Sequence, residues 1–256
     1  MRELLVRARR VDCPVLVFTV DLPTPGARYR DLRSGMMGQQ GLAGRLRQAL
    51  DGLMHPGWLW DVYLHGRPHS FGNLAAAMPR TRNFAEAWDW IRGNFDPSVT
   101  WKDIDFVRET WSGPIVVKGV LDAEDAREAA RTGVEGIVVS NHGGRQLDGV
   151  RSSVAVLPEV VDAVGDKLTV LMDGGVRSGL DVLKALALGA KACMLGRAWA
   201  FPLAAGGQAG VARMLATMRE ELRVAMVLNG CKDLTSANHT ALDVRLPGSF
   251  AARPTP

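Results

Sequence analysis

Residues 137–148, which read IVVSNHGGRQLD, decide the fold class and the candidate site. The β-branched run 137–139 is typical of a strand that is buried on both faces. Two glycines follow, and they let the backbone turn tightly and approach a ligand closely. They are flanked by His142, which can take a proton near neutral pH, and by Arg145, whose planar fork matches a carboxylate. The stretch indicates an active site, although a polar loop with a solvated His and Arg fits it equally well when it is taken alone.

The same pattern recurs downstream. The apolar run 168–173, LTVLMD, leads into the turn 174–179, GGVRSG, and then into a helical stretch. A third apolar run ends in Gly196-Arg197. A (β/α) barrel builds a phosphate site in this way after its last two strands, where backbone N–H groups and a helix N-terminus hold the anion. Two ordinary β-α turns are the weaker alternative, because Arg177 and Arg197 would both lie just past strand ends.

The stretch IVVSNHGGRQLD, the block LMDGGVRSGLDVLKALALGA and the closing LGRAWAF closely resemble the FMN-dependent α-hydroxy-acid dehydrogenase and oxidase family. The likeness runs from the first residues to about Leu242 and is strongest to bacterial respiratory L-lactate dehydrogenases. The resemblance implies an α/β fold of the (β/α)8 TIM-barrel type, FMN as the cofactor, a small 2-hydroxy acid as the substrate, and no metal.

The number of strands indicates an incomplete barrel. A length of 256 residues suits a whole barrel of roughly 250. Only five apolar runs read as strands, however, and they are 14–20, 114–117, 136–139, 169–172 and 192–195. By resemblance they are strands 4 to 8, so residues 1–242 are expected to form the carboxyl-terminal portion of a family member. Residues 29–111 would be a long loop over the active site, and 243–256 a disordered tail. Such a sheet has two open edges, which invite pairing with other chains.

The resemblance also assigns roles to single residues. His142 would be the catalytic base, Asp21 its hydrogen-bonding partner, and Lys118 a cation at the flavin edge where negative charge collects. Arg145 and Arg28 would bind the substrate carboxylate. The cofactor-binding residues would be Thr19, Lys118, Ser140, Asp173, Gly174, Gly175, Arg177, Gly196 and Arg197. Taken without the resemblance, Asp21 could be a turn cap, and Lys118 could extend its ammonium to water.

Composition bounds the class of protein and its compartment. Apolar residues make up 47% of the chain and charged residues 23%, as in an ordinary globular protein. Three separated cysteines argue against a disulfide scaffold and favour a reducing compartment. The net charge of +4 comes from scattered arginines without a nucleic-acid motif, so nucleic acid is not an expected partner. We therefore expect a cytoplasmic protein.

The long connection 29–111 suggests a membrane contact. It carries a basic helical piece at 42–50 and then Trp58, Trp60 and Tyr63. Amphipathic aromatics collect at membrane interfaces, so we expect peripheral attachment to the inner face of the cell membrane. Packing of these rings on the protein's own surface is an equally good alternative.

Three functions remain open at this point. The first is FMN-dependent oxidation of an L-2-hydroxy acid, with L-lactate favoured and with electrons passed to a quinone or other respiratory acceptor. The second is an oxidase that uses oxygen, or a mandelate- or glycolate-type enzyme. The third is an inactive fragment that binds phosphate weakly or pairs with other chains. We expect the chain alone to be inactive and the complete protein to be a dehydrogenase that forms homo-oligomers.

Overall fold

The computed structural model describes residues 1–29, 33, 41–66, 71–74, 78, 84–238, 240 and 242. The chain divides into two compact units. The first unit joins Met1–Asp21 to Val99–Pro256, and the second is Leu22–Ser98. The predicted tail 243–256 lies outside the described residues.

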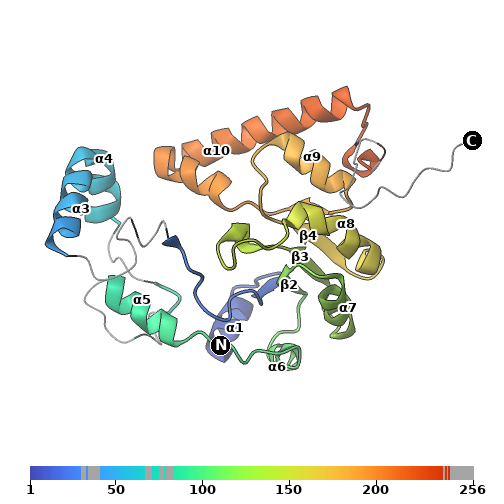
Figure 1. Cartoon of the computed structure of the whole chain (residues 1–256), viewed down its shortest axis with the longest axis horizontal. Coiled ribbons are helices and arrows are strands. Elements are labelled where there is room, and N and C mark those ends of the chain that lie inside the picture. The colour runs from blue at the N-terminus through green and yellow to red at the C-terminus, as the bar shows by residue number, and fades with distance from the viewer. Residues whose placement is uncertain are drawn as a thin grey trace, which may run out of the picture. The chain divides into compact units, whose positions relative to one another are not determined.

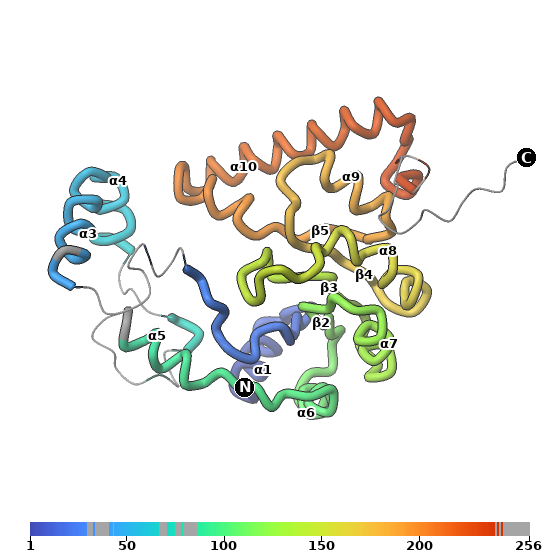
Figure 2. Tube along the Cα trace, viewed as in Figure 1, coloured from blue at the N-terminus to red at the C-terminus, as the bar shows by residue number. Residues whose placement is uncertain are grey.

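A parallel sheet forms the centre of the first unit (Figure 1). Its five strands follow one another in chain order, and every neighbouring pair is parallel. Figure 2 traces the chain through β2, β3, β4 and β5. The strands are β1 (Leu16–Thr19), β2 (Ile115–Val120), β3 (Gly136–Val139), β4 (Thr169–Met172) and β5 (Ala192–Cys193). The predicted α/β arrangement of five strands is therefore confirmed, with β1 and β5 as its edge strands.

Helices join the strands. Those of the first unit are α1 (Arg2–Arg10), α6 (Asp103–Arg108), α7 (Ala123–Arg131), α8 (Ser153–Val164), α9 (Gly179–Ala187) and α10 (Arg197–Leu228), with the 3₁₀ turns η2 (His142–Gly144) and η3 (Leu234–Ser236). In Figure 1, α7 and α8 lie next to each other beside the sheet, and α9 runs along α10. Since the strands are all parallel, their carboxyl ends meet at one edge of the sheet.

The core explains why these elements form. All four residues of β3 are buried, because it is the central strand and helices cover it. It packs with apolar side chains of β2, β4, α7 and α8 in one cluster. The helix α7 begins at Asp122, whose carboxylate accepts the N–H groups of Glu124 and Asp125. Burial of the apolar faces around β3 is the main stabilising contribution to this unit.

Helix α8 was not predicted from the sequence. Its residues, SVAVLPEVVDAV, include a proline and five valines, and neither residue type favours a helix. Four apolar side chains on one face, Val156, Leu157, Val160 and Val164, are nevertheless fully or almost fully buried. Tertiary packing therefore outweighs the unfavourable local propensity.

The second unit contains helices. Its elements are α3 (Leu42–Met54), α4 (Pro56–Trp58), the π-helical turn η1 (Leu59–Leu64) and α5 (Phe84–Gly93). The basic helical piece predicted at 42–50 is thus the start of α3. No helix among the described residues is long and apolar enough to cross a membrane.

Candidate active site

Strand register brings the predicted site residues to the carboxyl edge of the sheet. Thr19 ends β1 and is the register partner of Lys118 in β2. Ser140 directly follows β3, and its N–H donates to the carbonyl of Val120. Asp173 directly follows β4, and its N–H donates to the carbonyl of Val139. Residues that are far apart in the sequence therefore meet where parallel α/β folds place their sites.

His142 and Asp21 form a pair. The imidazole Nδ1 lies 3.2 Å from Asp21 Oδ1, and the side chains are 25% and 16% exposed. A carboxylate can only accept here, so Nδ1 carries the proton and Nε2 is left as the basic nitrogen. His142 also has a positive φ of 53°, which is uncommon for a non-glycine residue and typical of strained functional positions.

Lys118 lies between two polar partners. Its Nζ is 2.9 Å from Asp173 Oδ2 and donates to Ser140 Oγ at 3.0 Å. The same Ser140 oxygen accepts the backbone N–H of His142 at 3.1 Å. Ser140 is fully buried, and its hydroxyl oxygen fixes both Lys118 and the loop that carries His142.

A cavity of about 470 Å³ opens in front of these groups. It collects nine of the thirteen predicted site residues, which are Lys118, His142, Arg145, Asp173, Gly174, Gly175, Arg177, Gly196 and Arg197. Thr19, Asp21 and Ser140 do not line it, but each is the register partner or hydrogen-bond partner of a residue that does. Arg28 belongs to the second unit, so its role as a second substrate cation stays a prediction.

Two helices begin near the cavity, and they differ in how their first N–H groups are capped. At α9 the N–H groups of Arg177 and Ser178 donate to Asp181 Oδ2, and that of Gly179 donates to Glu221 Oε2. The α9 terminus is therefore capped by the chain's own carboxylates. At α10 the N-cap is Gly196, which has no side chain to serve as a cap. The α10 terminus is the one that can hold a phosphate, beside Arg197.

The residues fit FMN. Asp173 Oδ1 is buried and has no hydrogen-bond partner among the described residues, and an acceptor of this kind suits a ribityl hydroxyl. Gly174 and Gly175 have φ values of 89° and 82°, which turn the backbone tightly beside it. The N-terminus of α10 and Arg197 lie on the same cavity and suit the phosphate.

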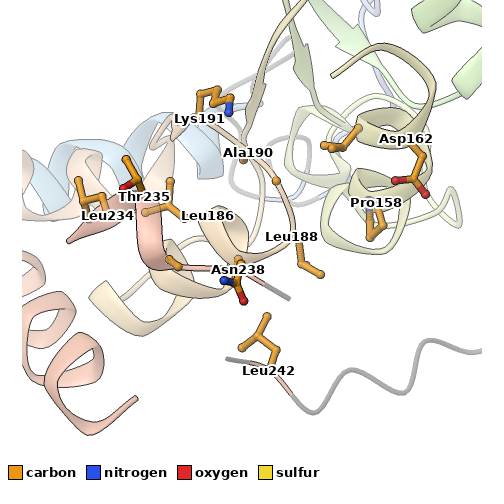
Figure 3. Close-up of a pocket in the computed structure, with 14 residues that line it drawn as sticks. Pro158, Asp162, Leu186, Leu188, Ala190, Lys191, Leu234, Thr235, Asn238 and Leu242 are labelled. Atoms are coloured by element: carbon orange, nitrogen blue, oxygen red, sulfur yellow. The ribbon is translucent and has the colours of Figure 1, made fainter. Parts of the chain in front are cut away.

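A larger cavity, about 770 Å³, lies elsewhere in the same unit (Figure 3). It is lined by the ends of α8 and α9, by the residues just before β5 and by η3. Asp162, Lys191, Thr235 and Asn238 provide its polar lining, and none of the predicted site residues lines it. Size alone therefore does not identify the functional cavity. Within the described part of the chain, no cluster of His, Cys, Asp or Glu could hold a metal ion.

Sequence reasoning also missed residues of the site, among them Ser153, Met194 and Trp199. Ser153 is 2% exposed, and its Oγ accepts the N–H of Asn141 at 3.2 Å, which anchors the histidine loop to α8. Met194 and Trp199 line the cavity after β5. Trp199 stands in the quoted block LGRAWAF, so the resemblance could have marked it. Ser153 gave no signal, because the helix that it begins was not predicted.

Comparison with known proteins agrees with this geometry. The FMN-dependent dehydrogenase family matches residues 1–244. An L-lactate dehydrogenase of Caulobacter vibrioides (strain NA1000 / CB15N) is 54% identical over 247 residues, which are 96% of this chain and 64% of that protein. An L-lactate dehydrogenase of Caulobacter sp. (strain K31) is 53% identical over 242 residues, covering 94% and 63%. The chain thus spans less than two thirds of the length of these relatives.

Solved structures of mandelate oxidase are also similar to this chain. A crystal structure of mandelate oxidase is 39% identical with a TM-score of 0.70, and the match covers 92% of this chain and 58% of that one. A complex of mandelate oxidase with 3,3-difluoro-2-hydroxy-3-phenylpropionic acid is 37% identical with a TM-score of 0.68, covering 93% and 57%. These neighbours are TIM barrels, and the five strands correspond to part of such a barrel. Membership of the family implies FMN as the cofactor. The chain belongs to the FMN-dependent dehydrogenase family.

Proposed function

We propose that this site belongs to an enzyme that oxidises an L-2-hydroxy acid, with L-lactate converted to pyruvate and the electrons passed to a respiratory acceptor. The observation that carries the proposal is the His142–Asp21 pair beside a cavity that Arg145 and Lys118 also line. His142 can act as a base, Arg145 can bind a carboxylate, and Lys118 is a fixed cation. Together they suit a substrate that carries both a hydroxyl and a carboxylate. The choice of lactate follows the names of the Caulobacter relatives.

The substrate would be held by its carboxylate. Arg145 is half-buried in the cavity wall, three residues after the base. Its guanidinium can donate two parallel hydrogen bonds to a carboxylate, which fixes the orientation of the α-carbon as well as its distance. Arg28 would add a second cation. This placement leaves the α-hydroxyl to be met by His142.

Proton transfer would occur at His142 Nε2. Because Nδ1–H donates to Asp21 Oδ1, the lone pair of Nε2 is available for the α-hydroxyl proton. The imidazolium that forms is stabilised by the Asp21 carboxylate, which lies behind it. The hydrogen bond that the His142 backbone N–H donates to Ser140 Oγ keeps the loop in the conformation that this transfer needs.

FMN, when bound, supplies the two-electron acceptor for the α-carbon. Asp173, Gly174, Gly175, Arg177, Gly196 and Arg197 would hold its ribityl chain and phosphate. Thr19 and Lys118 would lie along its ring, and the fully buried Ser140 would act through its hydrogen bond with Lys118. The ammonium of Lys118 is held in place by Asp173 and Ser140, so it provides a fixed positive charge in a partly buried site.

For the partners and location, we propose a quinone or other respiratory acceptor, a cytoplasmic protein attached peripherally to the inner face of the membrane, and a homo-oligomer when complete. The membrane contact would be made by α4 and η1 of the second unit. Trp58, Trp60 and Tyr63 are 51%, 61% and 44% exposed there, which suits rings that sit in an interface. Sedimentation with anionic vesicles, compared between the wild type and Trp58→Ala/Trp60→Ala, tests this contact.

An oxidase is the second candidate, because the neighbouring solved structures are mandelate oxidases. In that case reoxidation would use oxygen. Peroxide formed in stoichiometric amount with product, and a higher rate with mandelate than with L-lactate, would favour the oxidase over the dehydrogenase.

The proposed activity is tested by fusing the chain to the part of an L-lactate dehydrogenase relative that lies outside the match. In the FMN-loaded fusion, anaerobic L-lactate should bleach the flavin absorbance, and His142→Ala should abolish the bleaching while FMN stays bound. Bleaching that survives His142→Ala would remove the assigned base. For the chain alone we expect bound FMN without bleaching, since it spans 64% of the relative's length.

A further inference from the structure

Gly119 lies at an irregularity in β2, directly beside the predicted catalytic residues. Lys118 pairs with Val138 of β3, but the next residue of β3, Val139, pairs with Val120. Gly119 is therefore an extra residue in β2, which makes the irregularity a β-bulge. Its φ of 109° belongs to the region that favours glycine strongly. Bulges of this kind re-aim side chains next to active sites.

The bulge changes the face on which the neighbouring side chains lie. In a regular strand, residues 118 and 120 would share one face. Ile115, Val117 and Val120 instead all belong to the same buried core cluster, so the extra residue has moved Val120 to the face of Val117. Lys118 is left on the other face, where its ammonium reaches Asp173 Oδ2 at 2.9 Å.

The absence of a side chain at Gly119 makes room for Asp21. A Cβ atom at this position would lie 2.7 Å from both Cβ and Cγ of Asp21, and 3.0 Å from its backbone nitrogen. Contacts this short do not occur, so Asp21 would have to move. Because the backbone nitrogen is also close, rotation of the Asp21 side chain alone would not relieve the clash. Movement would separate Oδ1 from His142 Nδ1, which now lie 3.2 Å apart.

We propose that Gly119 is a positioning residue of the active site. Its positive φ allows the bulge that returns Val120 to the core face while Lys118 stays on the face of Asp173, and its lack of a side chain lets Asp21 come close enough to fix the His142 tautomer. The steric part of this proposal concerns the chain itself. The catalytic part rests on the proposed function, because only a reaction that uses His142 as a base requires the tautomer.

A double-mutant cycle tests the steric part without any activity. Gly119→Ala, Asp21→Gly and the double variant are unfolded in urea at a protein concentration where the chain is monomeric. Gly133→Ala is the control, because Gly133 has a φ of 73° and a Cβ added there would meet no described atom within 4 Å. Gly119→Ala should lower the urea midpoint more than Gly133→Ala does. Asp21→Gly removes both clashing carbon atoms, so in this background Gly119→Ala should lower the urea midpoint by less.

An equal loss of stability in both backgrounds would overturn the proposal, because Asp21→Gly leaves the backbone strain at φ 109° and removes only the contacts with Asp21 Cβ and Cγ. This comparison therefore separates the two causes. A Gly119→Ala chain that fails to fold is also informative, since recovery of folding in the double variant supports the clash and continued failure contradicts it.

The second measurement reads the histidine directly. In protein with ¹⁵N-labelled histidine, His142 should carry its proton on Nδ1 in the wild type and in Gly133→Ala. In Gly119→Ala, the Nδ1–H population should fall. An unchanged tautomer in a folded Gly119→Ala chain would contradict the positioning role. Neither readout involves lactate or FMN, so failure of the proposed oxidation would leave both results standing.

Discussion

The Nδ1 atom of His142 lies 3.2 Å from Oδ1 of Asp21, although the two residues are 121 positions apart in the chain. The pair joins the ends of β1 and β3, which are not neighbours in the sheet, because β2 lies between them. Gly119 of that middle strand leaves the space through which the pair forms. The contact therefore depends on three strands at once. Its loss should lower the catalytic rate more than it lowers the stability of the fold.

Replacement of Asp21 by asparagine keeps the size of the side chain and removes its charge. The rate of flavin reduction by L-lactate in the FMN-loaded fusion should fall by about 10²-fold or more, because the imidazolium loses its carboxylate and the tautomer is no longer fixed. FMN binding should be unchanged. Asp166→Asn, at an exposed position outside the site, is the control and should retain the wild-type rate. Equal rates in the two variants would exclude a role for Asp21.

Lys118→Met should destabilise the first unit by about 2–4 kcal/mol, because it leaves the largely buried Asp173 carboxylate without its cation. The side chains of this pair are 13% and 15% exposed. The control is Arg127→Ala, which breaks the Arg127–Glu124 pair, whose side chains are 49% and 66% exposed. That change should cost about 0–1 kcal/mol. Urea unfolding of both variants measures the free energy of unfolding that each loses. Equal losses would show that burial does not strengthen the contribution of the Lys118–Asp173 pair.

Some of the strands and site residues could be predicted from the sequence, whereas helix α8 could not. The strands β3 and β4 were predictable with their boundaries, because short β-branched runs end in glycine turns there. His142, Arg145 and Arg177 were expected just past strand ends from the sequence pattern, Asp173 was assigned by the family resemblance, and all four line one cavity. Helix α8 was not predictable, since its valines and proline oppose a helix and only tertiary burial stabilises it.

Gly119 shows a different limit of sequence reasoning. It stands beside the predicted Lys118, yet nothing local distinguishes a glycine in a bulge from one at a strand end. Its importance comes from Asp21, which follows a different strand much earlier in the chain. Similarly, the capping of α9 by Glu221 depends on a residue of α10, so only the fold shows which helix N-terminus can take a ligand. Contacts between distant segments decide both questions.

Burial raises the pKa of the Cys193 thiol from 9.0 to about 11, with a smaller contribution from the Asp181 carboxylate. The folded chain therefore favours the neutral thiol. The contribution of this thiol to the free energy of unfolding is fully present below pH 9.0 and is lost as the pH rises to about 11. The wild type should lose stability relative to Cys193→Ala across this window, as measured by urea unfolding at each pH. A constant difference would contradict the raised pKa.

Within the part of the chain that the structure describes, β1 pairs only with β2, and its other edge should promote self-association. Val15 and Val17 are 40% and 42% exposed on or beside this edge strand, which pairs on one side with β2. Sedimentation of the wild type should therefore depend on protein concentration. Val17→Lys should reduce the dependence, because a charge on an edge strand opposes pairing with another chain. Leu228→Lys, at an exposed position on α10, is the control, and an equal effect there would point away from the sheet edge.

The most direct test of the account is whether the chain retains FMN. The purified chain is incubated with FMN, excess is removed by gel filtration, and the absorbance spectrum is recorded. Because Asp173, the glycine turn, the N-terminus of α10 and Arg197 all lie on one cavity, the flavin band should remain near one equivalent. Arg197→Ala should lose it, while Arg127→Ala should not. A wild-type chain that retains no flavin would contradict the central claim that these five strands carry a complete phosphate and ribityl site.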